Sequence, residues 1–210
     1  KTSMVVPENA KVTTLYGKGY IIDRLCSLDF TIGPTSFYQV NPEQTEVLYT
    51  IAMRMAQLRS DDIVIDAYCG TGTIGLIAST YGVEKVLGIE SNADAIKDAV
   101  ANAEINKITN AEFVNADASK YLKEMAKNKE HCSVLFLDPP RAGSTEEFLA
   151  SVSRVDPDVI VYISCNPDTL QRDLRYIRRF LPYRVRGIQP VDMFPGSSHV
   201  ETVVLMSRNI

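Results

Sequence analysis

The sequence has few of the residues that build metal sites and disulfide frameworks. It contains two histidines, His131 and His199, and its four cysteines include no Cys-x-x-Cys pair. Zinc sites combine cysteines and histidines at short, characteristic spacings. We therefore expect no metal within this chain. With 210 residues, the chain is long enough to bury a sizeable core without disulfides or metals.

Long hydrophobic segments are also absent. The chain contains no run of about eighteen apolar residues, the length that a membrane-spanning helix needs. It does not open with a basic and apolar leader segment. These two absences predict a cytoplasmic protein without a membrane partner. Because the chain begins at Lys1 rather than at a methionine, we expect it to be a fragment or a processed product.

An excess of positive charge is the third feature that the sequence lacks. The formal net charge is −4, whereas domains that bind nucleic acid through bulk electrostatics usually carry a basic surplus. One segment departs from this average. Between residues 172 and 186, six arginines accompany a single acid, Asp173. Taken alone, this cluster is explained by the solvent-exposed face of a helix.

Short apolar runs alternate with amphipathic stretches of helix length from Asp61 onward. The first five predicted strands span residues 62–67, 85–90, 111–115, 133–138 and 159–164. The helices between and after them are expected to begin near Thr73, Ala93, Ala118, Thr145 and Pro167. Strands that are apolar on both faces and alternate with helices indicate a parallel sheet covered on both sides.

Two further predicted strands, 183–191 and 199–207, close the chain with no helix-length pattern between them. They are expected to pair as a hairpin. The sequence therefore predicts an α/β fold with a doubly wound, seven-stranded, mostly parallel sheet.

The first forty residues follow a different pattern. The segment 14–40, "TLYGKGYIIDRLCSLDFTIGPTSFYQV", alternates β-favouring residues with glycine and proline turn signals, which indicates a strand or a hairpin. A helix should follow it, because Asn41 and Pro42 have the residue types of an N-cap and a first helical position. Apolar residues then recur at helical spacing, at Val47, Leu48, Ile51 and Met55.

Candidate functional residues follow the ends of the predicted strands, where doubly wound sheets bind their ligands. In "DAYCGTGTIG" (66–75), Gly70 and Gly72 allow a tight turn before the helix at Thr73. The segment does not complete a dinucleotide-binding fingerprint, and a plain strand-to-helix turn also explains the glycines. Glu90 lies 24 residues after Asp66, where an acid can accept hydrogen bonds from ribose hydroxyls.

Two aspartates follow the third and fourth strands of this series. Asp117 is placed to bond an exocyclic amine such as that of adenine, but it is equally suited to cap the next helix. Asp138 opens the motif "DPPR", in which two prolines hold the acid at a rigid strand end. A simple strand terminator would not need an acid, so we expect Asp138 to be functional.

Cys165 stands between a predicted strand and a predicted helix that begins with Asn166 and Pro167. The partial positive charge of a helix N-terminus stabilises a thiolate. We therefore expect Cys165 to be the reactive cysteine, with a lowered pKa. The other three are expected to be inert, as most free cysteines are: Cys26, Cys69 and Cys132.

The last predicted strand begins "HVETVV". Glu201 has apolar neighbours, and burial would raise its pKa and make it a candidate base. His199 is a second candidate for this role. Spacing alone does not distinguish the two.

Four motifs occurring in order carry a resemblance to a known family: "DAYCGTGTIGL", "LDPPRAG", "YISCNPDTLQRDL" and "DMFPGSSHVETVVLMSR". Together they resemble the RNA uridine carbon-5 methyltransferases over residues 36–206. The resemblance is strongest to the branch that acts on 23S ribosomal RNA, with the transfer RNA branch close to it. It implies a Rossmann-like class I methyltransferase fold and S-adenosylmethionine as cofactor.

The resemblance also implies roles for particular residues. Cys165 would add to carbon 6 of uracil, and Glu201 rather than His199 would remove the carbon-5 proton. Phe37 would stack on a base or belong to the core, and the arginine cluster would contact RNA phosphates. Cofactor contacts are assigned to Gln39, Tyr68, Gly70, Thr73, Glu90, Asp117 and Asp138.

Domain organisation follows from the same resemblance. Residues 1–35 would be the trailing β segment of an upstream or central domain, and residues 36–210 the catalytic domain. Two other interpretations exist. The chain could be a non-catalytic, cofactor-binding module, or a nicotinamide-dependent dehydrogenase, which the incomplete fingerprint disfavours.

Overall fold

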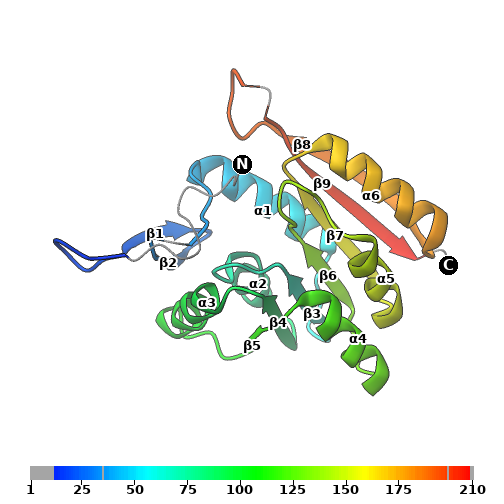
Figure 1. Ribbon diagram of the computed structural model, residues 1–210, viewed down its shortest axis with the longest axis horizontal. Helices are drawn as coiled ribbons and strands as arrows, with labels where there is room; N and C mark the ends of the chain where they lie inside the picture. The colour runs from blue at the N-terminus through cyan, green and yellow to red at the C-terminus, as the bar shows by residue number, and fades with distance from the viewer. Residues whose placement is uncertain (1–11, 35, 198, 209–210) are drawn as a thin grey trace.

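A seven-stranded sheet forms the centre of the molecule (Figure 1). The computed structural model describes residues 12–34, 36–197 and 199–208. The sheet strands are β3 (Ile63–Ala67), β4 (Lys85–Glu90), β5 (Ala111–Asn115), β6 (Val134–Leu137), β7 (Val159–Ser164), β8 (Tyr183–Val191) and β9 (Glu201–Arg208). Their spatial order is β5-β4-β3-β6-β7-β9-β8. This arrangement confirms the predicted sheet.

The first five of these strands run parallel, and β9 is antiparallel to both of its neighbours, β7 and β8. The chain moves outward from β3 to β4 and β5 and then returns to β6 on the other side of β3. The strand order therefore reverses between β3 and β6, and ligands of open α/β sheets bind beyond the strand ends at such a point.

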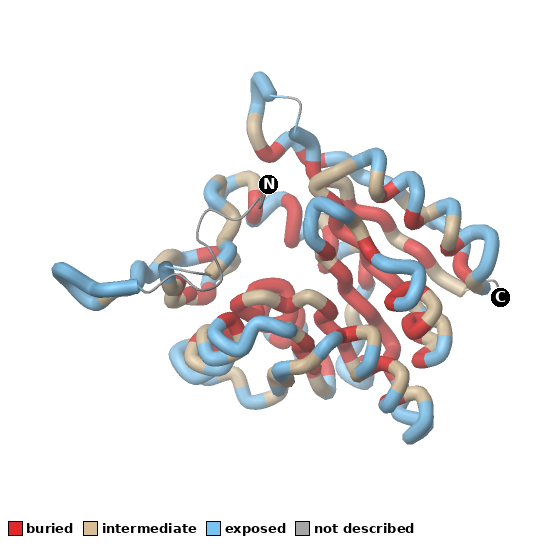
Figure 2. Tube along the Cα trace, in the orientation of Figure 1, coloured by how far each residue is buried: buried red, intermediate tan, exposed pale blue. Residues whose placement is uncertain are grey.

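Helices cover both faces of the sheet. On one face lie α1 (Pro42–Ala56), α2 (Thr73–Ser79) and α3 (Ala93–Ile105), and on the other lie α4 (Ala118–Asn128), α5 (Glu146–Val155) and α6 (Pro167–Phe180). Successive strand residues alternate between the two cores, as the pleat of a strand requires. Phe136 packs with α1 and α2, whereas Leu137 packs with α4 and α5. Figure 2 shows that the buried residues concentrate on the strands and the inner helix faces.

Side-chain caps set the helix starts, and they explain one difference from the prediction. Asn41 accepts a hydrogen bond from the Gln44 N–H, and Asn166 accepts one from the Asp168 N–H, as N-caps do. α5 begins at Glu146 rather than at Thr145, because the Thr145 side chain is itself the cap.

The predicted N-terminal β segment is confirmed as a hairpin of β1 (Ile21–Leu25) and β2 (Leu28–Ile32). Asn102 and Asn106 of α3 bond the β2 backbone: Asn102 Oδ1 accepts from Thr31 N at 2.7 Å, and Asn106 Nδ2 donates to Asp29 O at 2.7 Å. Phe30 is fully buried in the core beneath α1 and α2. The domain boundary after residue 35 stays a prediction, and residues 1–11 lie outside the described part of the chain.

The last strand differs from its predicted bounds. β9 begins at Glu201, two residues later than predicted, and extends to Arg208. Within the residues that the structure describes, no helix is both long enough and apolar enough to cross a membrane.

Candidate active site

The β7–β9 ladder places Cys165 and Glu201 side by side. Cys165 directly follows β7, and Glu201 is the first residue of β9. The antiparallel register pairs Ser164 with Thr202, so the next step along both chains sets Cys165 opposite Glu201. Residues opposed in this way have Cα atoms about 4.5–5.5 Å apart. A thiol and a carboxyl group are therefore neighbours at the end of the sheet.

Further acids converge on the same end of the sheet. Asp138 follows β6, the parallel neighbour of β7, and Asp66 lies near the end of β3. Burial raises the pKa of Asp138 well above its ordinary value, and the charges of Glu201 and Asp66 raise it further. Three carboxyl groups thus interact electrostatically at this end of the sheet, one within β3, one after β6 and one at the start of β9.

The pKa values of both candidate catalytic groups are raised in this setting, and Arg141 opposes both shifts. Burial raises the pKa of Glu201 to about 7, and the charge of Arg141 opposes the shift. The pKa of Cys165 is also raised, first by burial and then by Glu201 and Asp138, again against Arg141. The prediction of a lowered thiol pKa is wrong for this structure, because burial and two acids outweigh the helix N-terminus.

The turn between β3 and α2 has the backbone geometry of a ligand-binding loop. Tyr68, Gly70 and Gly72 all have positive φ angles, of 63°, 53° and 81°. A positive φ is uncommon for a tyrosine and marks a backbone that its surroundings hold in place. A side chain at Gly70 would meet open space, whereas one at Gly72 would meet the Phe113 ring at 2.8 Å. Packing therefore requires glycine at position 72, and the turn is open at position 70.

Glu90 braces this turn from the end of β4. One of its carboxylate oxygens accepts from Gly70 N at 3.2 Å, and the other accepts from Asn92 N at 2.8 Å. Thr73, at the start of α2, lies beside Thr71, with 3.2 Å between their hydroxyl oxygens. The carboxylate and the turn thus form one connected unit.

Asp66 leaves an oxygen atom without a partner next to this unit. Its Oδ2 accepts from Gly75 N at 2.8 Å, while Oδ1 is buried and has no hydrogen-bond partner among the described residues. Burial raises the pKa of Asp66 to about 7; the Gly75 hydrogen bond opposes this shift and the charge of Glu90 adds to it. A buried and unpartnered acceptor fits a ligand that brings a hydrogen-bond donor.

The remaining predicted contacts lie around the same strand ends. Tyr68 is half-buried and packs its ring on Phe148, with 5.0 Å between the centroids. Asp117 is exposed and caps α4 by accepting from Lys120 N at 2.9 Å. Its contact in this structure is therefore that of a helix cap. Gln39 is half-buried, two residues before the N-cap of α1.

Arg172 and Asp173, in the region of the arginine cluster, both have structural partners, although 56% of the Arg172 side chain is exposed. Asp173 is 1% exposed and accepts from the Tyr162 hydroxyl and from Ser144 N, both at 2.7 Å. Arg172 bonds Asp173 and also donates to the carbonyls of Ala142 and Ser144. This network fastens the loop after Asp138 to α6.

The other arginines of the cluster divide between the strand β8 and the outside of α6. Arg186 donates to the Ser207 hydroxyl and to the Arg208 carbonyl, which ties β8 to β9. Exposed positions on α6 are occupied by Arg175, Arg178 and Arg179. These three remain the part of the cluster suited to phosphate contact.

Tyr49 and Arg141 belong to the site but were not singled out as functional from the sequence. Tyr49 of α1 is 4% exposed, and its pKa is raised well above its ordinary value by burial and then by Asp138, Asp66 and other charges. Tyr49 is not one of the apolar residues at helical spacing from which this helix was predicted. Arg141 was used only as part of the "LDPPRAG" motif, although its charge acts on Cys165 and Glu201.

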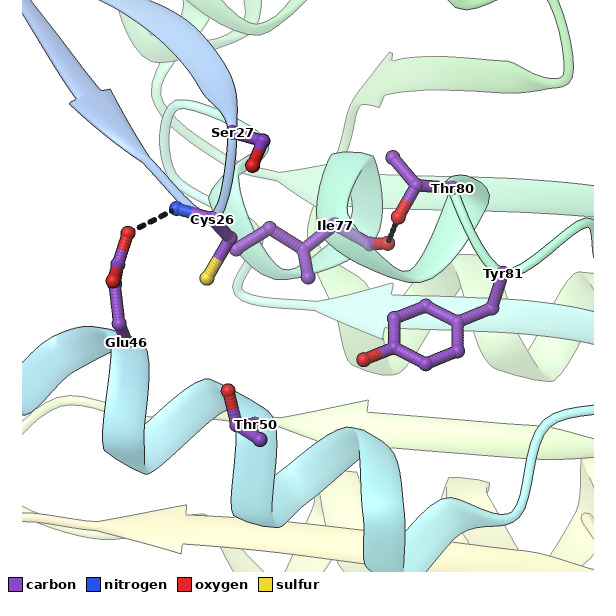
Figure 3. Close-up of a pocket in the computed structure, with 7 residues that line it drawn as sticks. All are labelled: Cys26, Ser27, Glu46, Thr50, Ile77, Thr80 and Tyr81. Carbon is purple, nitrogen blue, oxygen red and sulfur yellow. Dashed lines mark hydrogen bonds between the residues drawn. The ribbon is translucent and has the colours of Figure 1, made fainter.

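A separate hollow lies between the hairpin, α1 and α2 (Figure 3). Its volume is about 350 Å³, and it contains Cys26. The backbone N–H of Cys26 donates to Glu46 at 2.7 Å, and burial and this glutamate raise the pKa of the thiol to about 11. The hollow shares no residue with the strand-end site. Cys26 therefore lies apart from the strand-end site, and its inertness stays a prediction.

No group of three or more histidine, cysteine, aspartate or glutamate side chains suited to a metal ion occurs in the described ranges. The titratable groups of the site are instead a thiol, several carboxyls, a tyrosine hydroxyl and one guanidinium.

The strand order and the residues beyond it define the class of this protein. The structure resembles that of the Pyrococcus abyssi tRNA (uracil-54, C5)-methyltransferase in complex with S-adenosyl-L-homocysteine, with a TM-score of 0.76 and 35% identity over 91% of this chain and 45% of that one. The fold is that of a Rossmann-like methyltransferase. Residues 20–209 match the model of the tRNA (uracil-5-)-methyltransferase family, and the chain belongs to this family.

Curated relatives agree at the level of the family. A protein of Bacillus cereus described as an uncharacterized RNA methyltransferase is 45% identical over 94% of this chain and 43% of its own length. A protein of Oceanobacillus iheyensis with the same description is 44% identical over 100% of this chain and 45% of its own length. The chain thus spans less than half the length of these relatives.

More distant structures share the fold alone. That of M. jannaschii TYW2 in complex with AdoMet has a TM-score of 0.65 and 20% identity, over 94% of this chain and 90% of that one. Membership of the uracil-5 family confirms the resemblance seen in the motifs and excludes the dehydrogenase interpretation. The choice of 23S ribosomal RNA over transfer RNA stays a prediction.

Proposed function

We propose that this chain is the catalytic part of an enzyme that methylates carbon 5 of uridine in RNA, with S-adenosylmethionine as the methyl donor. The observation that carries the proposal is the placement of Cys165 opposite Glu201, at the end of the sheet in a member of the uracil-5 family. This pairing brings together a nucleophile and an acceptor for a proton.

The chemistry needs both groups. Carbon 5 of uracil is a weak nucleophile until another group adds to the ring. The Cys165 thiolate forms a bond to carbon 6, and the electron pair of the ring double bond becomes an enolate at carbon 5. Carbon 5 then takes the methyl group, and the donor leaves as S-adenosylhomocysteine. Glu201 removes the carbon-5 proton, and the released electron pair restores the double bond and expels the thiolate.

The residues around the β3–α2 turn fit the proposed donor. The turn offers open space at Gly70, Asp66 has an unpartnered buried oxygen, and Glu90 lies at the strand end where ribose hydroxyls bind. When bound, the donor supplies an electrophilic methyl group and a positive charge. We assign its contacts to Gln39, Tyr68, Gly70, Thr73, Glu90, Asp117 and Asp138.

A positive charge on a bound donor also suits the acids of the site. In the protein alone, burial and two carboxyls raise the pKa of Cys165. A cation near Asp138 and Glu201 would favour the charged forms of these groups. We therefore propose that the acid cluster serves to hold the donor and to accept a proton, whereas thiolate formation depends on compensating positive charge.

Two classes of RNA are candidate substrates. The motifs favour 23S ribosomal RNA. Transfer RNA is the second candidate, because the Pyrococcus abyssi protein, 35% identical, is a tRNA (uracil-54, C5)-methyltransferase. On either RNA, Arg175, Arg178 and Arg179 would contact phosphates. Phe37, which is 78% exposed, is available to stack on a base.

The test uses RNA that contains 5-fluorouracil, incubated with the chain and S-adenosylmethionine. Fluorine at carbon 5 cannot be removed as a proton, so the covalent complex should persist under denaturing conditions. Mass analysis should find the adduct in the wild type and in Cys26→Ala, which removes a cysteine away from the site, but not in Cys165→Ala. Fragments of 23S ribosomal RNA and transfer RNA, used in parallel, identify the substrate.

The same experiment separates the alternatives. The alternative is a non-catalytic module. It would be supported, and methylation contradicted, if S-adenosylmethionine binds but no adduct forms, both with this chain and with a longer protein of the length of the curated relatives. An adduct that forms only in the longer protein would place RNA capture outside this chain and leave the nucleophile here.

A further inference from the structure

A contact between Arg141 and His199 joins two loops that flank the site. Arg141 Nη2 lies 3.1 Å from His199 Nδ1. Arg141 belongs to the loop after β6, and His199 belongs to the loop that leads into β9, two residues before Glu201. The contact therefore reaches from the "DPPR" loop to the loop of the proposed base.

The backbone of Arg141 is fixed on the other side. Its carbonyl accepts from Asn166 Nδ2 at 3.1 Å and lies 3.4 Å from the donating Thr169 hydroxyl. Asn166 is the N-cap of α6 and the residue directly after Cys165. The main chain of Arg141 is thus tied to the segment of the nucleophile, while its side chain is tied to the segment of the base.

This position sets a cation beside the acids of the site. The charge of Arg141 lowers the pKa of Cys165 and that of Glu201, against the burial and the carboxyls that raise them. A positive charge near a thiol favours the thiolate. Arg141 therefore acts in the direction that the proposed reaction requires, on both groups at once.

The contact also determines which ring nitrogen of His199 acts as a hydrogen-bond acceptor. A guanidinium has donors and no acceptor, so the imidazole Nδ1 must accept with its lone pair. The tautomer that fits this contact carries its proton on Nε2. Its Nδ1 is engaged with Arg141, which leaves Glu201 as the group opposite the thiol. The two candidate bases of the "HVE" segment thus take different tasks.

We propose that Arg141 is the cation that offsets the acids around Cys165, and that His199 is the positioning residue that holds its guanidinium there. This inference rests on the proposed function for its catalytic consequence. Its electrostatic part concerns the protein without RNA and is tested separately.

The first experiment measures alkylation of Cys165 by iodoacetamide across pH, with peptide mapping to isolate this thiol and Cys165→Ala as the blank. The Arg141→Gln variant should react about three- to ten-fold more slowly than the wild type near neutral pH, because a partly exposed cation shifts a neighbouring thiol modestly. Arg54→Gln removes the same charge from the last turn of α1 and should react as the wild type does.

His199 variants test the positioning role. Asparagine presents an oxygen close to the place of Nδ1, whereas leucine offers no acceptor. His199→Leu should therefore slow alkylation of Cys165 towards the Arg141→Gln rate, and His199→Asn should restore most of the wild-type rate. Thermal unfolding of each variant checks that the fold is retained.

The second experiment measures the rate of adduct formation with 5-fluorouracil RNA. Arg141→Gln and His199→Leu should slow the reaction of bound RNA, by a similar factor to that seen in alkylation. If Arg141→Gln instead raises KM alone and leaves alkylation unchanged, Arg141 is a phosphate contact and the proposal is wrong. If alkylation responds but no variant forms an adduct, the proposed function fails while the electrostatic role of Arg141 stands.

Discussion

Cys165 and Glu201 face each other across the β7–β9 ladder, although 36 residues separate them in the sequence. The paired register of β7 and β9 ends with Ser164 opposite Thr202, one residue before this pair. α6 follows the cysteine directly, and the strand β8 covers the other side of β9. A thiol and a carboxyl group thus lie at the same end of the sheet.

Replacing Glu201 by glutamine should block the last part of the proposed reaction. The amide cannot take the carbon-5 proton, so ordinary RNA and S-adenosylmethionine should leave a methylated covalent adduct on Cys165. Turnover should fall by about 10²- to 10⁴-fold, the usual contribution of a general base. Glu104→Gln, an exposed acid on α3, is the control. Normal turnover in Glu201→Gln would assign proton removal to another group.

The same substitution should have the opposite effect on the reactivity of the thiol. Glu201 raises the pKa of Cys165, so Glu201→Gln should lower this pKa and increase the thiolate fraction near neutral pH. Alkylation of Cys165 should become about three- to ten-fold faster, although turnover falls. Slower alkylation, or an equal rate across the pH range, would show that the two groups are not coupled.

Asp66 should make the protein less stable as the pH rises. Burial raises its pKa in the folded protein from 3.8 to about 7, so between these values the folded state holds a proton that the unfolded state has lost. The free energy of unfolding therefore falls through this window, by an upper limit on the order of 4 kcal/mol.

Asp66→Asn removes this titration. The free energy of unfolding of the variant should therefore decrease less than that of the wild type between pH about 5 and about 8. Urea denaturation at both values measures the difference. Asp61→Asn, a neighbouring acid with 80% of its side chain exposed, should follow the wild type. An equal decrease in the free energy of unfolding for Asp66→Asn and the wild type would contradict the raised pKa.

Loss of Asp173 should release the loop that carries Asp138. In Asp173→Ala, the Tyr162 hydroxyl and the Ser144 N–H lose their acceptor, and Arg172 loses its ion-pair partner. Leaving a buried donor without an acceptor costs about 1–3 kcal/mol for each group. Asp168→Ala removes an exposed acid from the first turn of α6 and should cost less than about 1 kcal/mol. Chemical denaturation compares the two variants, and equal losses would contradict the role of the network.

Gly72 should be intolerant of a methyl group for two separable reasons. Gly72 and Gly82 have similar φ angles, 81° and 78°, so alanine carries a similar backbone cost at both positions. At Gly72 the new Cβ would also meet the Phe113 ring at 2.8 Å and the Ala99 Cβ at 3.1 Å, whereas at Gly82 nothing lies within 4 Å. Gly72→Ala should therefore be less stable than Gly82→Ala by about 1–3 kcal/mol, measured by thermal unfolding.

Much of the architecture could be predicted from the sequence because its signals are local. The caps Asn41 and Asn166 act on backbone groups two or three residues away, and the strands β4, β5 and β7 coincide with their apolar runs. Motif order led to the family for a similar reason, since each motif is a short contiguous segment. The small errors fell at strand and helix ends, as with Thr145, where a cap was counted as helix.

Properties that depend on distant neighbours could not be predicted in this way. Cys165 was expected to have a lowered pKa from the adjoining helix alone, but burial first, and then the charges of Glu201 and Asp138 from other parts of the sheet, raise it. Arg172 was counted with the exposed arginines, and 56% of its side chain is exposed, but the sequence did not show that Asp173 and the loop after Asp138 bond its guanidinium. Periodicity describes which face of an element is apolar, and it carries no information about which charges meet.

The sequence by itself determined the order of strands and helices, the caps that start the helices, and the residues that follow each strand. These features arise from side chains acting on backbone within a few positions. Only the tertiary structure decided that Cys165 stands opposite Glu201 and that Arg141 joins their two loops. Charges, burial and register are set by residues that the chain brings together from afar, because electrostatic and packing energies depend on distance in space and not on separation along the sequence.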